Sequence, residues 1–235
     1  MTILNTYDGA LFVSTITGLA HDLGVHIRLG DDFHEYRDII KHHRPEQPPA
    51  PPLDPDVHDM SSGFWFTGTD AEGKLVFTQA MRDIDLGDLT LAEYLTANFR
   101  DFPPASLPVD VPNSRYLPGP AARKITGRVC YHADLWMRPG ESSYRGSGLP
   151  NVLARLAMVT AIMRGSPDYI FGFIARNHAF KGLGEREGYM HSEPSALHWL
   201  RADKPETLVC QMVWMGREDL EHLLTIPPEG VMRAA

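Results

Sequence analysis

A glycine-containing segment at residues 145–149 is the first part of this sequence that could bind a ligand. It reads Arg-Gly-Ser-Gly-Leu, and apolar residues with helical spacing follow it. Glycines let a backbone approach a ligand closely, and the first amides of a helix are unpaired donors at the positive end of its dipole. The segment therefore predicts either a plain turn or an anion site suited to a pyrophosphate, with Arg145 adding charge. It lacks the lysine of a P-loop and the third glycine of a dinucleotide-binding loop.

Side chains that could exchange protons lie just before this segment. Tyr131, His132 and Asp134 fall in one apolar run, and Glu141 and Tyr144 follow it. In a regular strand, His132 and Asp134 would share one face and Tyr131 would lie on the other. A phenol with a pKa near 10 is a poor base at neutral pH. The general base stays open among these residues and a water relay, and ordinary hydrogen-bonded polar residues are the alternative for each.

The second half of the chain has regular signals for the elements around these residues. We expect a strand at 125–137, a helix at 149–164, a strand at 169–175 and a helix ending near 187. Strands at 189–201 and 207–215 and a closing helix at 217–224 follow. The helix at 149–164 has an apolar stripe. The longest apolar stretch of the sequence, Val152–Met163, has twelve residues and contains Arg155, so it is too short to span a membrane.

The first half is interrupted by two proline-rich stretches, at 45–55 and 103–120. Before the first, we expect a strand at 25–29 and a helix at 33–43 capped by Asp31 or Asp32. Runs at 63–69 and 75–80 predict a hairpin, and residues 89–99 predict a short helix.

Several motifs together resemble the GNAT superfamily of acyl-CoA-dependent N-acyltransferases. They are Trp136-Met137-Arg138-Pro139, the loop at 144–149, Asn177, and Gly188-Tyr189, which follows Asn177 by eleven and twelve residues. The resemblance implies an α/β (α+β) fold with a twisted mixed central sheet flanked by helices. An extra helix and proline-rich insertion would lie at about 81–124. It implies a single domain over residues 1–235, with the motif-bearing core at about 63–215.

The same resemblance implies acetyl-CoA or another acyl-CoA as co-substrate, a small-molecule amine as acceptor, and no metal. Backbone groups at Leu135, Trp136 and Met137 would meet the acyl and pantetheine groups, and Asn177 would contact pantetheine. The pyrophosphate would bind at Arg145, Gly146, Ser147, Gly148 and Leu149. A homodimer is among the expected partners.

Four departures from the family pattern stand out. The loop before Arg145 is about three residues longer than usual, and Ser143 replaces a Gln or Arg. An insertion of about 45 residues precedes the long strand and could form part of an acceptor pocket or a lid. Gly184 occupies the position at which many members have an acid tyrosine, and Tyr189 is interpreted as a core residue without a catalytic role.

Two other functions remain open. One is a long-chain acyl transferase similar to the N-acyl amino acid or homoserine-lactone synthases, with acyl-ACP or acyl-CoA as donor. The other is a non-catalytic acyl-CoA-binding module, which the glycine at 184 favours.

The composition limits the function classes further. With 22 Lys and Arg against 30 Asp and Glu, the net charge is −8. This argues against a general nucleic-acid binder, which needs a basic surface. The two cysteines, Cys130 and Cys210, predict core residues in a reducing compartment, with a disulfide or a metal site as the alternative. No membrane span or signal peptide is expected, and the location predicted from these features is cytoplasmic.

Overall fold

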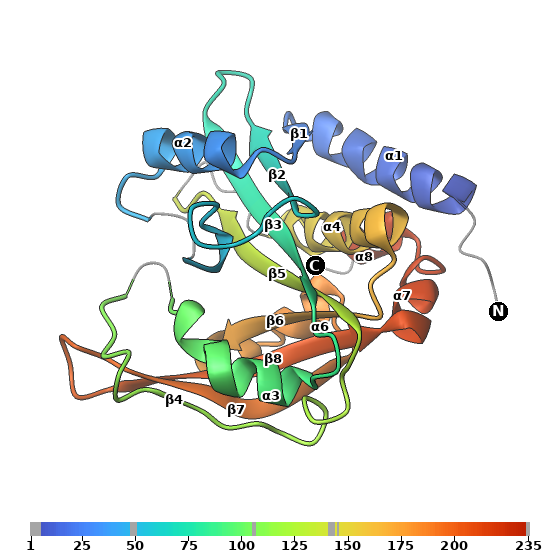
Figure 1. The fold of residues 1–235 in the computed structure, drawn as a ribbon. Coiled ribbons are helices and arrows are strands. Elements are labelled where there is room, and N and C mark those ends of the chain that lie inside the picture. Colours follow the sequence, from blue (N-terminus) through green and yellow to red (C-terminus); the bar gives the residue numbers. More distant parts are fainter. Residues whose placement is uncertain (1–5, 48–50, 105–106, 141–143, 145, 234–235) are drawn as a thin grey trace.

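The computed structural model describes residues 6–47, 51–104, 107–140, 144 and 146–233. Its strands form an eight-stranded sheet in the order β1-β2-β3-β5-β6-β8-β7-β4 (Figure 1). They are β1 His26–Gly30, β2 Phe64–Thr69, β3 Leu75–Asp85, β4 Arg115–Tyr116, β5 Arg128–Met137, β6 Tyr169–Ala175, β7 His191–Leu200 and β8 Thr207–Gly216. The sheet contains parallel and antiparallel pairs, which confirms the expected mixed-sheet fold class.

The helices lie on both faces of this sheet. They are α1 Thr6–Asp22, α2 Phe33–His43, α3 Leu91–Asn98, α4 Leu149–Gly165, α5 Arg176–Ala179, α6 Leu183–Glu187, α7 Arg217–Leu223 and α8 Pro228–Arg233, with short 3-10 turns at Pro51–Leu53 and Phe99–Asp101. One hydrophobic core joins α1, α4 and α7 to the sheet, and a second joins α2 and α3 to it. We call these faces the α4 face and the α2 face.

Local signals explain why several elements form where expected. Asp32 caps α2, because its Oδ1 accepts hydrogen bonds from His34 N at 2.9 Å and Glu35 N at 3.3 Å. In the β2–β3 turn, Asp70 Oδ1 accepts a hydrogen bond from Lys74 N at 2.8 Å. Thr90 and Glu93 form a capping box that starts α3.

Other elements differ from the sequence expectation. α1 was not expected, and it packs against α4, so that α4 is buried from Val152 to Ile162 rather than along one stripe. β3 continues to Asp85 because it pairs with β5 as far as that residue. The helix expected after β6 is divided into α5 and α6 by Gly182, whose φ is +72°.

The proline-rich insertion covers the α2 face of the sheet. Leu91, Leu95 and Phe99 enter the core on this face, and β4 extends the sheet beside β7. Glu193 on β7 holds the insertion, since its carboxylate accepts hydrogen bonds from Ala121 N and Ala122 N.

Two further expectations concern cysteines and membranes. Cys130 and Cys210 are both buried and free, as predicted. No helix in the described part of the chain is long and apolar enough to cross a lipid bilayer.

Candidate active site

The parallel strands β5 and β6 separate near the middle of β5. They pair only at Val129–Tyr169, Cys130–Ile170 and Tyr131–Phe171. β5 then continues to Met137 alongside β3, with no strand on its other edge within the described residues. β5 and β6 are therefore a parallel pair that diverges toward the glycine loop. We call this point of separation the fork.

A β-bulge lies immediately beyond the fork. Ala80 pairs with Ala133, but Thr78 pairs with Trp136, so β5 has one more residue than β3 between these pairs. Asp134 occupies the bulge with φ of +50°. The extra residue rotates Asp134 away from His132, so the expectation that these two side chains share a face is wrong.

Asp134 lies on the α2 face, in a buried network with Tyr36, Arg44 and Thr78, which we call the aspartate network. Arg44 binds the carboxylate with two nitrogens, Nη2 to Oδ1 at 3.0 Å and Nη1 to Oδ2 at 3.1 Å. Tyr36 Oη donates to Oδ2 at 2.6 Å, and Thr78 Oγ1 donates to Asp134 O at 3.0 Å. Both carboxylate oxygens are therefore occupied by donors.

Burial has opposing consequences in this network. The Asp134 and Arg44 side chains are each only 6% exposed. Burial raises the pKa of Asp134 above its ordinary value, although the neighbouring Arg44 opposes the rise. Burial and the Asp134 carboxylate also raise the pKa of Tyr36, which keeps its phenol protonated. The network therefore holds one ion pair, and donors from Arg44 and Tyr36 occupy both oxygens of its carboxylate.

His132 lies on the α4 face, in a second buried network with Gln79 and Tyr189, the histidine network. His132 Nδ1 is 3.0 Å from Tyr189 Oη, and its Nε2 is 3.2 Å from Gln79 Oε1. Gln79 Nε2 donates to Leu153 O at 2.7 Å. Since the Gln79 amide nitrogen is used there, its oxygen faces His132 and accepts the Nε2 proton.

That arrangement assigns every proton in the histidine network. His132 carries its proton on Nε2, so Nδ1 accepts from the hydroxyl of Tyr189. Burial lowers the pKa of His132 to about 4 and raises that of Tyr189 well above its ordinary value. The network is thus neutral, with Tyr189 as a proton donor.

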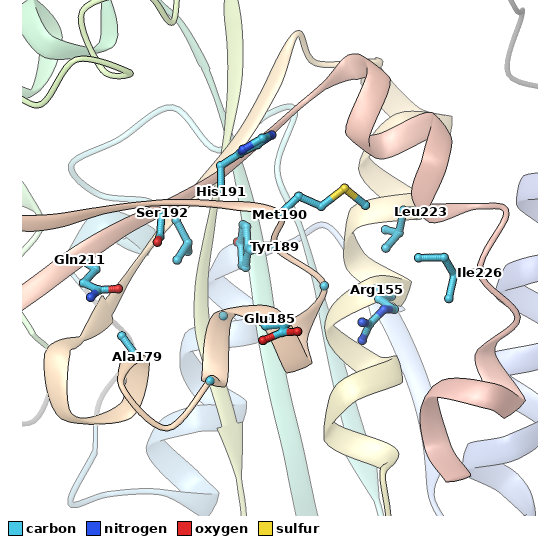
Figure 2. Close-up of a pocket in the computed structure, with 14 residues that line it drawn as sticks. Arg155, Ala179, Glu185, Tyr189, Met190, His191, Ser192, Gln211, Leu223 and Ile226 are labelled. Carbon is cyan, nitrogen blue, oxygen red and sulfur yellow. The ribbon is translucent and has the colours of Figure 1, made fainter. Parts of the chain in front are cut away.

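The hydroxyl of Tyr189 is located at the fork. A Cβ on Gly172 of β6 would be 3.1 Å from Tyr189 Oη and 3.1 Å from His132 O. The glycine therefore leaves room for the Tyr189 hydroxyl between the two strands. Tyr189 also lines a groove of about 580 Å³ over α6 (Figure 2).

The other predicted proton-transfer residues occupy different surroundings. Tyr131 is packed among Phe102, Phe171 and Phe173, and burial raises its pKa. Tyr144 is half-buried beside the α4-face core. Glu141 lies outside the described residues.

The glycine loop ends at the first turn of α4. Gly146 has φ of +84° and Gly148, the N-cap, has φ of +77°. Ser147 Oγ accepts from Leu149 N at 3.2 Å and donates to Tyr144 O at 2.6 Å. Arg145 lies outside the described residues.

Gly146 and Gly148 have different neighbours. Apart from its chain neighbours, no atom of the described residues lies within 4 Å of a Cβ built on Gly146, which is exposed. A Cβ on Gly148 would instead meet the backbone of Met232 in α8. Gly148 is therefore needed for helix packing, whatever the loop binds.

The remaining predicted cofactor residues lie along β5 and α5. Leu135 and Met137 pack on the α4 face, whereas Trp136 lies on the α2 face under the Arg44 guanidinium, 4.6 Å from its ring centre. Asn177 is exposed in α5 and lines a separate groove of about 500 Å³ with Arg176 and Arg201.

Gly184 lies in a closed position. A Cβ there would be 3.1 Å from Val213 Cγ1 and 3.5 Å from Ile174 Cδ1, so a tyrosine would need these residues to move. The tyrosine of the histidine network, Tyr189, lies five residues after Gly184 in the sequence. Sequence reasoning assigned Tyr189 to the core and did not identify Tyr36, Arg44 or Gln79, because only long-range contacts reveal their roles.

Comparisons with known proteins give structural matches only. No protein-family model matches the sequence, and no curated protein matches it. Among solved structures, NAA60 from Arabidopsis thaliana in complex with acetyl-CoA matches with a TM-score of 0.45 and 9% identity, over 83% of this chain and 99% of that one. The dodecameric spermidine N-acetyltransferase from Vibrio cholerae matches with a TM-score of 0.44 and 10% identity, over 83% and 95%. Both are GNAT N-acetyltransferases, the class that the sequence resembles.

Proposed function

We propose that this protein transfers an acyl group from acyl-CoA to the amine of a small-molecule acceptor. The observation that carries the proposal is the fork: two parallel strands separate after three residue pairs, toward a glycine loop that begins a helix. The free edge of β5 at residues 135–137 supplies backbone groups for the acyl and pantetheine amides. The backbone of the loop at Gly146 and Gly148 is the proposed contact for the pyrophosphate, since the amides of Ser147 and Leu149 are hydrogen-bonded within the loop.

We assign the proton transfer to Tyr189. The amine nitrogen attacks the thioester carbonyl, the new C–N bond forms, and the C–S bond breaks. The Tyr189 hydroxyl turns its proton from His132 Nδ1 to the leaving thiolate, while its oxygen takes the proton that the amine nitrogen loses. His132, neutral and bound to the hydroxyl, orients it.

The remaining candidates fit this role less well. Both carboxylate oxygens of Asp134 are held by Arg44, and Tyr36 adds a further hydrogen bond to Oδ2. The Tyr131 ring is enclosed by other aromatic rings. The chain's net charge of −8 favours an acceptor that is cationic in solution and that loses one proton to the solvent before its neutral nitrogen attacks.

A CoA titration tests the loop. We expect Gly146→Val to weaken CoA binding at least tenfold, because its side chain would fill the open side of the loop and its φ is unfavourable for valine. Gly73→Val is the matched control, since Gly73 also has positive φ and open space but lies in the β2–β3 turn. Gly148 variants are unsuitable because of the Met232 contact. Equal CoA affinity in the Gly146 and Gly73 variants would contradict the loop's assignment.

An acyl-transfer assay tests the chemistry. Free-thiol release is measured with acetyl-CoA and longer acyl-CoAs over a panel of small amines. We expect turnover by the unmodified protein and a 10²- to 10⁴-fold lower kcat for Tyr189→Phe with unchanged CoA affinity. Tyr116→Phe is the control, since its hydroxyl is also buried but lies on β4. Absence of thiol release above background, together with tight CoA binding, would leave a binding module instead of an enzyme.

A further inference from the structure

Arg155 is a buried cation in the middle of α4. Arg155 is only 7% exposed. The other buried residues of α4 are almost all apolar. Arg155 Nη1 donates to Asn151 O at 2.6 Å and to Arg186 O at 2.5 Å. Its Nε is buried and has no hydrogen-bond partner among the residues that the structure describes. No carboxylate of the described chain lies within ion-pair distance of it, and a buried charge without a counter-charge is costly.

The neighbouring acid does not neutralise this cation. Glu187 is the carboxyl group that acts on Arg155 electrostatically, and it is itself buried. Burial raises the pKa of Glu187 to about 8, so the group is mostly protonated and uncharged at pH 7. Arg155 therefore has no ion-pair partner among the described residues, and burial lowers its own pKa.

Arg155 lines the groove over α6. Figure 2 shows its guanidinium extending from α4 toward Glu185, with Leu223 and Ile226 beside it. Gly188 has φ of +105°, and a Cβ there would be 3.1 Å from Arg155 Nε. A glycine at 188 thus gives the guanidinium its room at the groove.

We propose that this groove binds an organic anion, namely a single carboxylate that carries an apolar chain. The carboxylate pairs with the Arg155 guanidinium, which has donors to spare. The chain lies along Ile226 and beside the Met190 thioether, both of which line the groove. Glu185 on the opposite wall is negatively charged, which favours one small anionic group over a polyphosphate.

Calorimetric titration of the CoA-free protein with octanoate, acetate and octylammonium tests this. We expect octanoate to bind at least tenfold more tightly than acetate, because octanoate has an apolar chain. We also expect it to bind at least tenfold more tightly than octylammonium, because octylammonium carries the opposite charge. Arg155→Met should weaken octanoate binding at least tenfold. Ile226→Ala should weaken octanoate two- to fivefold without affecting acetate. Arg164→Met, an exposed arginine of the same helix, should change neither.

Two results would overturn the proposal. One is the absence of saturable octanoate binding at millimolar concentration. The other is octylammonium binding as tightly as octanoate to the unmodified protein, a comparison that needs no variant to fold. Because no CoA is present, the result does not depend on whether the glycine loop binds CoA.

Discussion

Two buried polar networks lie on opposite faces of β5. Their β5 members, His132 and Asp134, are two residues apart in the sequence. The aspartate network on the α2 face is an ion pair, with both carboxylate oxygens bound. The histidine network on the α4 face is neutral, with His132 between Tyr189 and Gln79. Even their β3 partners are adjacent, since Thr78 serves the first network and Gln79 the second.

The difference between the networks indicates a division of roles. Charge-assisted bonds between Arg44 and Asp134 fix a backbone conformation with φ of +50°, which a non-glycine residue rarely adopts. The neutral network fixes no strained backbone, but it holds one hydroxyl proton at the fork. We infer that the aspartate network shapes the site and that the histidine network serves its chemistry.

Of the tests that separate the two networks, substitution of Arg44 should cause the largest loss of stability. Arg44→Met leaves the Asp134 carboxylate buried without its cation, so the free energy of unfolding should fall by about 3–5 kcal/mol. Urea denaturation at pH 7 measures this loss. The double variant Arg44→Met/Asp134→Asn should recover part of it, because no buried charge remains.

The cycle formed by these variants and Asp134→Asn gives the coupling energy between the two residues. A coupling energy near zero would contradict the shaping role. Substitution of Arg44 should not change the contribution of His132 to the pH dependence of the free energy of unfolding.

Acidification is the next largest test, and it acts on the histidine network. The pKa of His132 is about 4 in the folded protein and near 6.5 in the unfolded chain. The unfolded chain therefore binds the proton more tightly, and the stabilisation present above pH 6.5 is lost as the pH falls toward 4. Between pH 7 and pH 4.5 the loss should be roughly 2–3 kcal/mol.

Comparison with His132→Gln isolates this contribution. Glu187 acts in the opposite direction, since its pKa of about 8 makes the folded state gain stability as the pH falls from 8 toward 4.5. Glu187 titrates in both proteins, so the difference between their urea-denaturation curves reports His132 alone. Equal pH slopes in the two proteins would contradict a neutral buried His132.

The sequence predicted those parts of the fold that depend on nearby residues. α2 begins at Phe33 because Asp32 caps it, and β6 has the bounds expected from its apolar run. The orientation of Asp134 was beyond such reasoning, because the bulge depends on register with β3 and on Arg44, 90 residues away. Likewise the sequence analysis did not predict α1, which packs on α4.

The candidate site shows the same limit. His132 was identified because its type and position next to the glycine loop are visible in the chain. The role of Tyr189 depends on Gly172 having no side chain and on His132, 57 residues away. A tyrosine that opens a strand has the same local pattern whether or not its hydroxyl has a buried partner.

Substituting the adjacent residues Thr78 and Gln79 gives the smallest and most closely matched test. Thr78→Val preserves the shape of the side chain and removes the hydroxyl that accepts from Arg44 and donates to Asp134 O. The loss of stability should be about 1 kcal/mol, since Arg44 keeps both contacts with the carboxylate.

Gln79→Leu should reduce stability more, because it leaves the Nε2 proton of His132 and Leu153 O without this hydrogen-bond partner in the interior. Gln79→Leu should also slow thiol release by removing the bond that fixes the His132 tautomer, whereas Thr78→Val should leave the rate within about twofold. Urea denaturation and the thiol-release assay on both variants give the two measurements, and a larger rate effect from Thr78→Val would assign the chemistry to the aspartate network instead.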